Sequence, residues 1–246
     1  MLLEAVGIVK KFGGLMALNK ASMSVNEGEI FGLIGPNGAG KTTLLNVIAG
    51  VYKPNEGVLR FDKQDISGWS PDMVCRVGIA RTFQVPKKFQ KMSVLENVIV
   101  ASTFGLIKHT KTPKALAEEA LDFVKFPLAF DTIAGRLNSG QLKRLDMARA
   151  LASQPRLLLL DEPASGLNPS EVGELLVLIR EINKTGVTVI LVEHLMKLIM
   201  NVTGRMVVLD YGEKIAEGSP DEIVHNKRVI EAYLGDEYTK EAETAN

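Results

Sequence analysis

The sequence predicts an α/β fold in which a parallel sheet has an antiparallel β edge and is interrupted by an inserted α-helical subdomain. Short β-like segments come early in the chain, at residues 2–9, 21–25 and 58–61. An unbroken apolar run, typical of a buried parallel strand, comes late, at residues 157–160, and another buried strand is expected at residues 187–192. Residues 94–152, which lie between them, have a mainly helical pattern. We therefore expect a helical insertion between two halves of one α/β core.

A strand-to-helix turn at residues 35–42 carries the most specific pattern of the chain, Gly-Pro-Asn-Gly-Ala-Gly-Lys-Thr. Apolar runs flank it on both sides, at residues 29–34 and 43–49. Its glycines allow backbone conformations that a Cβ would block, so that N–H groups converge on a phosphate in front of the helix. Lys41 would reach the terminal phosphates, and the Thr42 hydroxyl would ligate Mg²⁺. The predicted nucleotide contacts are Gly35, Pro36, Asn37, Gly38, Ala39, Gly40, Lys41, Thr42 and Thr43.

Composition and charge exclude several classes of protein. The 246 residues contain 29 Lys and Arg against 29 Asp and Glu, so the net charge gives no support to a nucleic-acid partner. Cys75 has no second cysteine to pair with, which fits a reducing compartment and a small buried apolar residue. Glu4 and Lys10 interrupt any signal-peptide pattern, and no apolar run is long enough to span a bilayer. We expect a cytoplasmic protein that is able to dock on a membrane protein.

Helix signals mark the middle and the end of the chain. Thr112 and Pro113 form an N-cap followed by a proline in the first turn. The helix behind them is expected to bury Leu116, Ala120, Leu121 and Val124. Capping boxes are expected at residues 168–171 and 219–222. The helix after the first of these is expected to bury Val172, Leu175, Leu176 and Ile179.

A shift in composition near residues 85–88, where Lys and Phe replace Gly and Val, suggests where the insertion begins. We expect one domain whose core comprises residues 1–85 and 153–235, with the helical subdomain at residues 86–152. The polar residues 236–246 are expected to form a frayed tail.

Two acidic residues follow the apolar run at 157–160, in the sequence Leu-Asp-Glu-Pro. Ligands of open α/β sheets bind at the carboxyl ends of the strands, which is where these residues are expected. Asp161 is then placed to bind Mg²⁺, directly or through water. Glu162 is placed to orient or deprotonate an attacking water. Together with the phosphate loop, the pair predicts nucleotide hydrolysis.

Residues 137–141, Leu-Asn-Ser-Gly-Gln, precede a helix expected over 142–152, with Leu142, Leu145, Ala148 and Leu151 on its buried side. This segment resembles the Leu-Ser-Gly-Gly-Gln signature of ABC-type ATPases, and the resemblance covers nearly the whole chain. It implies a P-loop NTPase core of RecA-like type that uses ATP and Mg²⁺. It also implies a head-to-tail dimer in which each signature faces the γ-phosphate held by the other subunit. The signature residues are Asn138, Ser139, Gly140 and Gln141.

The signature departs from the family pattern at its second position. The usual serine is replaced by Asn138, and Ser139 follows it. An asparagine amide donates hydrogen bonds to phosphate but is bulkier than a hydroxyl. Either Asn138 substitutes directly or Ser139 takes over the hydroxyl contact, and both alternatives stay open.

The resemblance assigns further roles, one residue at a time. Gln84 matches the glutamine that contacts Mg²⁺ and the attacking water, and His194 matches the switch histidine near the γ-phosphate. Phe12 matches the aromatic residue that stacks on adenine, although a core phenylalanine is the alternative. Residues 165–168 match the dimer-facing loop, which in the family more often ends in Asp than in the Asn found here.

Several stretches look like the ATP-binding subunits of branched-chain amino-acid importers, at residues 78–84, 92–98, 164–169 and 192–197. This resemblance implies permease subunits as partners and a second ATPase subunit, either a copy of this chain or a paralogue. A substrate-binding protein would be an indirect partner. The chain would then lie on the inner face of the cell membrane. Residues 92–98 fall in the region that faces the membrane subunits in such importers.

Three alternatives remain. The chain could energise a transporter of another substrate, for example in lipopolysaccharide export. It could be a soluble ABC protein in translation or DNA repair, but the chain has one P-loop, one signature and no sustained heptads. It could be a binding module that does not hydrolyse ATP, but Glu162 and His194 argue against this.

Overall fold

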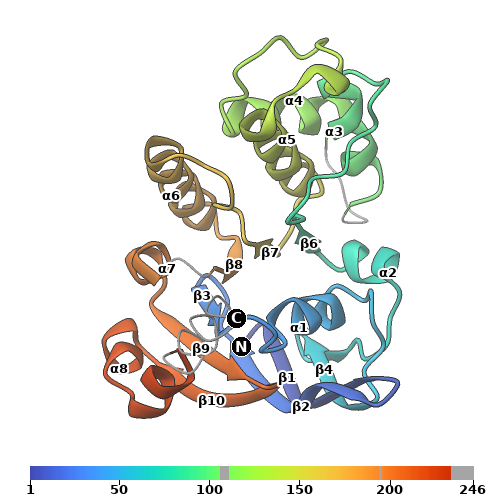
Figure 1. Ribbon diagram of the computed structural model, residues 1–246. Helices are drawn as coiled ribbons and strands as arrows, with labels where there is room; N and C mark the ends of the chain where they lie inside the picture. The colour runs from blue at the N-terminus through green and yellow to red at the C-terminus, as the bar shows by residue number, and fades with distance from the viewer. Residues whose placement is uncertain (106–110, 194–195, 234–246) are drawn as a thin grey trace. The chain divides into compact units, whose positions relative to one another are not determined.

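The computed structural model describes residues 1–105, 111–193 and 196–233, which divide into two compact units (Figure 1). The first unit contains residues 1–69 and those from 190 onward, and the second contains residues 70–189. The second unit therefore includes strands as well as helices. The narrower helical subdomain expected at residues 86–152 stays a prediction.

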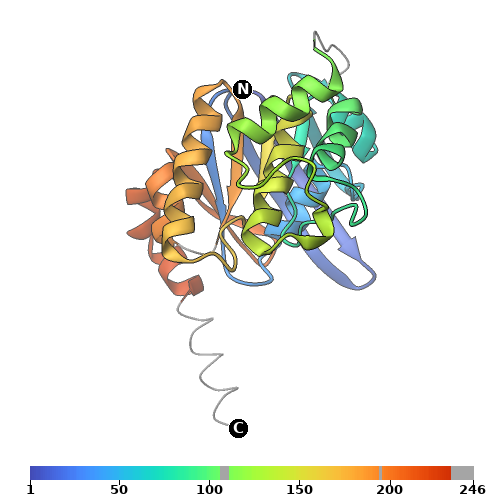
Figure 2. The ribbon, with the colours of Figure 1, turned by 90° about the horizontal axis from the view of Figure 1, so that it is seen from above.

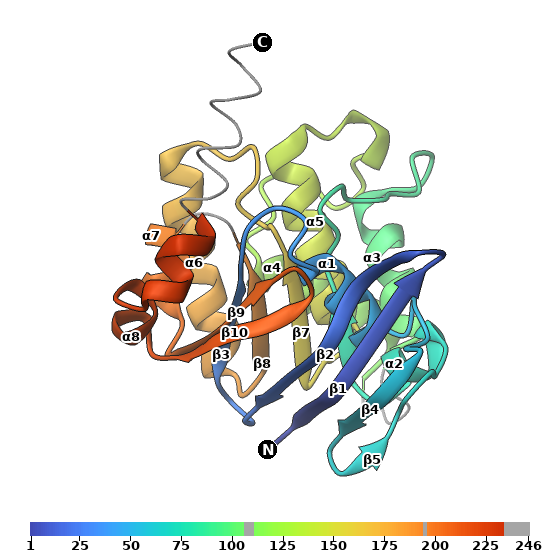
Figure 3. The same ribbon diagram turned by 60° about the horizontal axis from the view of Figure 1, so that its bottom comes forward.

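An antiparallel sheet in the first unit confirms the predicted β edge (Figure 3). Its strand order is β2-β1-β4-β5, with β1 antiparallel to both of its neighbours. The strands are β1 (Leu3–Phe12), β2 (Leu15–Val25), β4 (Glu56–Phe61) and β5 (Gln64–Asp65). Leu3 and Ile8 of β1 are both completely buried although they are five residues apart, because the pairing with β2 shifts register between Ala5 and Ile8.

The first unit also contains the predicted strand-to-helix turn, which lies between β3 (Ile30–Ile34) and α1 (Lys41–Ile48). The strand β3 is parallel to β9 (Arg205–Asp210), and β10 (Glu213–Gly218) is antiparallel to β9. Among its described residues, this unit contains the helices α1, α7 (Met196–Val202) and α8 (Pro220–Val224), and residues 227–233 are also helical. The capping box predicted before α8 is present, because the Ser219 hydroxyl accepts from the Glu222 N–H and the Glu222 carboxylate accepts from the Ser219 N–H.

Three mutually packed helices, α3, α4 and α5, dominate the second unit (Figures 1 and 2). Its helices are α2 (Pro71–Arg76), α3 (Val94–Thr103), α4 (Pro113–Phe123), η1 (Ala134–Arg136), α5 (Ser139–Ala152) and α6 (Pro169–Lys184). Its strands are β6 (Ile79–Arg81), which is parallel to β7 (Leu157–Asp161), and the first residues of β8 (Thr188–Val192). Both predicted late strands are present and completely buried, except that the second begins at Thr188, so that Val187 is half-buried and precedes it.

The helix starts that the sequence predicts at Thr112 and Asn168 are confirmed. The Thr112 hydroxyl accepts from the Ala115 N–H at the start of α4, and the predicted stripe of α4 is buried. The capping box at Asn168 and Glu171 is also present.

Among the described residues, no helix has the length and apolar character needed to cross a bilayer.

Two predictions of buried helix faces were wrong in part. On α6, Ile179 is buried, but Val172, Leu175 and Leu176 are only half-buried. Leu175 lines a pocket instead of packing in a closed core. On α5, Leu145 and Ala148 are buried as expected, whereas Leu142 and Leu151 are half-buried. Additional positions of α5 are also buried: Asp146, Met147, Ala150 and Ala152. Asp146 and Met147 line the same pocket as Leu175.

The single cysteine is half-buried rather than fully buried. The Cys75 thiol donates to the carbonyl oxygen of Phe104 at 3.7 Å. Burial raises the pKa of the thiol, so the reactive thiolate is disfavoured. Cys75 is therefore unsuited to nucleophilic chemistry, as its sequence context suggested.

Candidate active site

The turn between β3 and α1 requires glycine for steric reasons. Gly35 and Gly40 have φ of 146° and 98°, a region that residues with a Cβ rarely adopt. A Cβ on Gly35 would lie 2.1 Å from the carbonyl oxygen of Leu209, and one on Gly40 would lie 2.6 Å from that of Ala17. No real Cβ approaches an oxygen so closely. The tight path of the loop therefore depends on these two glycines.

The first turn of α1 is arranged as an anion site. Its N-cap, Gly40, provides no side-chain hydrogen bond, and no acidic residue lies in the first turn. Unpaired N–H groups and the positive end of the helix dipole attract a phosphate at such a position. Asn37, Gly38 and Thr42 are exposed on this loop, whereas Gly35, Pro36 and Ala39 are buried and support it.

Lys41 lies close to the loop backbone. Its side chain is only 7% exposed, and its Nζ donates to the carbonyl oxygens of Gly35 and Pro36 at 2.6 and 2.8 Å. The ammonium group is thus held within the loop that encircles the predicted phosphate position. Thr43, the next predicted contact after the exposed Thr42, is half-buried.

Phe12 is not a core residue. It ends β1 with 41% of its surface exposed, and it contacts the Tyr52 ring edge-to-face with centroids 5.1 Å apart. Lys10 Nζ lies 5.1 Å from the Phe12 centroid. An exposed aromatic ring held by its neighbours offers a surface on which a planar base stacks.

Asp161, at the carboxyl end of β7, is 2% exposed. Its Oδ2 accepts from Arg81 Nη2 at 2.8 Å, which pairs the buried charge. Its Oδ1 is also buried and has no hydrogen-bond partner among the described residues. A buried carboxylate oxygen without a partner is costly, and a hard divalent cation or its bound water would supply the missing contact. The residue therefore fits a magnesium ligand.

Glu162 follows directly and has φ of 47°, a left-handed conformation that is uncommon outside glycine. Asp161 is buried, whereas Glu162 after this turn is half-buried. Glu162 Oε2 accepts from Gln84 Nε2 at 2.8 Å. Two residues 78 positions apart, both predicted to act on the attacking water, are therefore in direct contact. Uncommon backbone conformations of this kind are concentrated at functional sites.

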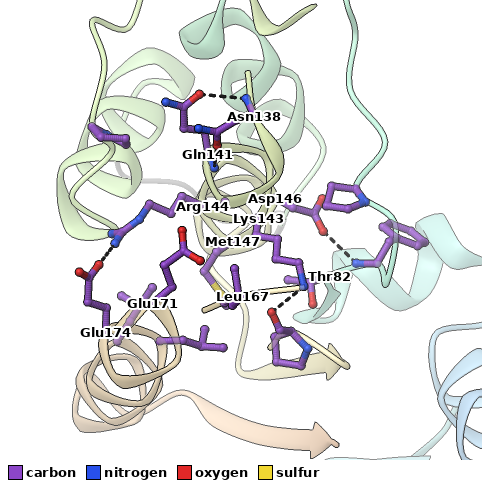
Figure 4. A pocket seen from close by; sticks show the side chains of 17 residues that line it. Thr82, Asn138, Gln141, Lys143, Arg144, Asp146, Met147, Leu167, Glu171 and Glu174 are labelled. Carbon is purple, nitrogen blue, oxygen red and sulfur yellow. Dashed lines mark hydrogen bonds and ion pairs between the residues drawn. The ribbon is translucent and has the colours of Figure 1, made fainter. Parts of the chain in front are cut away.

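The predicted signature forms the start of α5. Asn138 is the N-cap: its Oδ1 accepts from the Gln141 N–H at 2.9 Å, and its N–H donates to Gln141 Oε1 at 3.0 Å (Figure 4). Ser139 is the first residue of the helix. A Cβ on Gly140 would lie 3.1 Å from Glu171 Oε1, so α6 approaches the start of α5 closely at this position. His194 lies outside the described residues.

The sequence interpretation missed several charged residues around this site. Arg81 pairs with Asp161, and Lys143 Nζ donates to the Pro163 carbonyl oxygen at 2.8 Å. Arg144 pairs with Glu174, which connects α5 to α6 (Figure 4). Asp146 is buried within α5. Only Asp146 gave a signal in the sequence, as an acidic residue next to the predicted buried position Leu145.

Burial raises the pKa of Asp146 from its ordinary value of 3.8 to about 6, although the Phe83 N–H and the Arg149 charge act in the opposite direction. Because the folded pKa is the higher one, this group stabilises the fold fully below pH 3.8, and the contribution is lost as the pH rises through 6. At pH 7, Asp146→Asn should therefore be more stable than the wild type, by up to about 3 kcal/mol. The difference should shrink toward zero near pH 4. Denaturant unfolding of both proteins from pH 4 to pH 8 measures it, and a difference independent of pH would contradict the assignment.

Comparison with known proteins shows the family of the chain. A family model described as ABC transporter matches residues 18–165, and one described as branched-chain amino acid ATP-binding cassette transporter matches residues 213–239. The high-affinity branched-chain amino acid transport ATP-binding protein BraF of Pseudomonas aeruginosa is 40% identical, covering 96% of this chain and 98% of BraF. LivG of Escherichia coli, which carries the same description, is also 40% identical with the same coverage.

Solved structures show the same fold. The ADP conformation of MJ1267, an ATP-binding cassette of an ABC transporter, superposes with a TM-score of 0.86 at 33% identity, covering 95% of this chain and 98% of that one. The dimeric post-hydrolysis state of the ATP-binding cassette MJ0796, bound to ADP and Pi, has a TM-score of 0.80 at 26% identity, covering 89% and 99%. The chain belongs to the ABC transporter family, in its group of branched-chain amino-acid transport ATP-binding proteins.

Proposed function

We propose that this chain is the subunit that binds and hydrolyses ATP to drive a membrane importer of branched-chain amino acids. The observation that carries the proposal is the contact between Gln84 and Glu162 beside Asp161 at the end of β7. This arrangement has a role in hydrolysis and is not needed for nucleotide binding alone. The names of the relatives, which describe branched-chain amino acid transport, support the cargo.

In this proposal the loop between β3 and α1 binds the phosphates of ATP. Its N–H groups and Lys41 offset the phosphate charge, and Phe12 stacks on the adenine. The full set of proposed ATP contacts is Phe12, Gly35, Pro36, Asn37, Gly38, Ala39, Gly40, Lys41, Thr42 and Thr43. The exposed Thr42 hydroxyl and the exposed ring of Phe12 support these roles.

Thr42, Gln84 and Asp161 would hold Mg²⁺, and the unpartnered Oδ1 of Asp161 supports this assignment. The cation, when bound, offsets charge on the phosphate oxygens. Glu162 accepts the proton of the attacking water as general base, and Gln84 orients the same carboxylate through its amide. His194, which is not among the described residues, is proposed to contact the γ-phosphate.

Asn138, Ser139, Gly140 and Gln141 are proposed to serve the ATP of a second ATPase subunit. Dimers occur among the related structures, as in MJ0796 bound to ADP and Pi. The Oδ1 atom of Asn138 is occupied by the helix cap, so its Nδ2 is the group left to donate to a phosphate. We propose that the dimer docks on permease subunits at the inner face of the membrane and receives cargo through a substrate-binding protein.

Asn138→Ser should retain or raise ATP hydrolysis, because serine caps a helix as well as asparagine does and supplies a hydroxyl. Asn138→Ala should lose the acceptor for the Gln141 N–H and about 1 kcal/mol of stability. Turnover assays and thermal unfolding of both variants check this. If Asn138→Ser loses most of its activity at unchanged stability, the asparagine has a role that serine does not replace.

Reconstitution tests the proposed function. The chain, expressed in its native host, should co-purify with membrane subunits, and the complex in vesicles should accumulate labelled leucine, isoleucine or valine when ATP is supplied on the side of this chain. The same complex carrying Glu162→Gln should bind ATP without uptake. ATP hydrolysis stimulated by another class of substrate would contradict the assignment of branched-chain amino acids as the cargo. A chain that never associates with membrane subunits would favour a soluble ABC function.

A further inference from the structure

The segment that carries Gln84, residues 82–89, is held by few apolar contacts. It runs between β6 and α3 without regular structure. Phe83, Val85 and Phe89 are 43%, 76% and 45% exposed. A segment whose apolar side chains are exposed gains little from the core, so polar contacts must determine its position.

A pocket beside this segment leads to the same conclusion. The pocket has a volume of about 320 Å³ and lies among α5, α6 and the segment, with Phe83 and Pro86 on its wall (Figure 4). Met147 and Leu178 contribute apolar surface from the two helices. On this side the segment therefore borders open space instead of a packed layer.

The first polar contact comes from the middle of α5. Asp146 Oδ2 accepts from the Phe83 N–H at 2.8 Å, and the carboxylate points toward the segment (Figure 4). Asp146 is 5% exposed, so water competes little for this hydrogen bond. Phe83 immediately precedes Gln84, whose amide donates to Glu162. Fixing the Phe83 peptide thus fixes the starting point of the Gln84 side chain.

A second contact holds the far end of the segment. Arg149, one turn after Asp146 on α5, donates to the Lys87 carbonyl oxygen and lies 5.9 Å from the Phe89 ring centroid. Its Nη1 is 3.5 Å from Asp146 Oδ1, so the two side chains form one ion pair. From α3, Asn97 Oδ1 accepts from the Phe89 N–H at 2.9 Å. The segment is therefore tethered at both ends, and Asp146 holds the end next to Gln84.

We propose that Asp146 is a positioning residue, which holds Gln84 against Glu162 by fixing the Phe83 N–H. The catalytic meaning of this inference rests on the proposed function, whereas the tether itself does not. Burying a carboxylate is costly, and an apolar residue of similar size often serves stability better. The advantage of Asp146 is therefore placement of the segment. The helix α5 begins with the proposed signature and also carries Asp146. The same helix therefore connects the contact that positions Gln84 with the end that is proposed to face the second ATPase subunit.

Two substitutions of Asp146 separate placement from folding. Asp146→Leu removes the acceptor for the Phe83 N–H, and Asp146→Asn keeps one. In Asp146→Leu, kcat for ATP should fall about tenfold or more, KM for ATP should stay within about twofold, and the amide of Phe83 should exchange hydrogen at least about tenfold faster. Asp146→Asn should restore both kcat and slow exchange. Asp122→Leu on the exposed face of α4 is the matched control and should change neither.

The outcomes distinguish this inference from the proposed function. If Asp146→Leu keeps the wild-type kcat and slow exchange at the Phe83 amide, the inference is overturned. A loss of kcat that accompanies a lower melting temperature and is not rescued by Asp146→Asn would also overturn it, because it would show a purely structural role. If the wild type itself hydrolyses no ATP, the proposed function fails, and the exchange rates alone decide whether Asp146 tethers the segment.

Discussion

Glu162→Gln should slow ATP hydrolysis by at least about a hundredfold and leave ATP binding intact. A carboxamide has nearly the shape of a carboxylate but does not accept the proton of an attacking water. The oxygen that faces Gln84 Nε2 is retained, so the contact between residues 84 and 162 and the turn at φ 47° should persist. The substitution therefore removes the proposed base with little change in geometry.

Phosphate release and equilibrium binding of ATP, measured on the same preparations, check this result. Glu181→Gln is the matched control, because Glu181 is an exposed residue of α6 that pairs only with the exposed Lys184 among the described residues. The control should hydrolyse ATP at the wild-type rate. Retention of more than about a third of the activity in Glu162→Gln would show that another group is the base.

Gly35→Ala should weaken ATP binding by about a hundredfold or more and destabilise the fold by about 3 kcal/mol. The added Cβ would meet the Leu209 carbonyl oxygen at 2.1 Å, and φ of 146° is itself unfavourable for alanine. Either the end of β9 or the phosphate loop must move. Because the loop N–H groups bind phosphate only when they converge, a small displacement costs much affinity.

Titration with ATP and thermal unfolding of Gly35→Ala measure the two effects. Gly204→Ala provides the control: Gly204 lies just before β9, and an added Cβ meets nothing within 4 Å. This variant should resemble the wild type in both measurements. Wild-type affinity in Gly35→Ala would contradict the proposed path of the phosphate loop.

The sequence predicted the parts of the site that are encoded locally. The turn at residues 35–42 combines glycines, a lysine and a threonine within one octet, so a single pattern specifies the backbone path and the phosphate contacts. Asp161 and Glu162 follow an unbroken apolar strand, and the strand places them at the carboxyl edge. Helix caps such as Asn168 were equally clear, because capping depends on residues three positions apart.

Tertiary packing decided what could not be predicted. The apolar spacing of α5 identifies one buried face, but Asp146, which is off that face, is buried where it accepts a hydrogen bond from the distant Phe83 N–H. The pairing of Arg81 with Asp161 joins residues 80 positions apart, and no local pattern specifies such a partner. Leu175 of α6 was expected in the core and lines a pocket instead, because helical periodicity shows which residues share a face but not what covers it.

Asn138 combines one feature that the sequence shows with another that only the structure shows. Its departure from the family signature was visible in the sequence, but its role as the cap of α5 became clear only from the hydrogen bonds with Gln141. The cap uses the amide oxygen and leaves the amide nitrogen for a ligand. If Asn138 contacts the phosphate, its Nδ2 is the donor; if Ser139 does, its hydroxyl is the donor.

Steady-state phosphate release by the wild-type chain, measured over a wide range of chain concentration with and without its membrane subunits, tests the central claim most directly. If two subunits complete each ATP site, hydrolysis should occur, and without the membrane subunits its rate per chain should rise with concentration toward a plateau. A chain that binds ATP but releases no phosphate under any of these conditions, or one whose rate per chain without the membrane subunits is independent of concentration, would contradict the account.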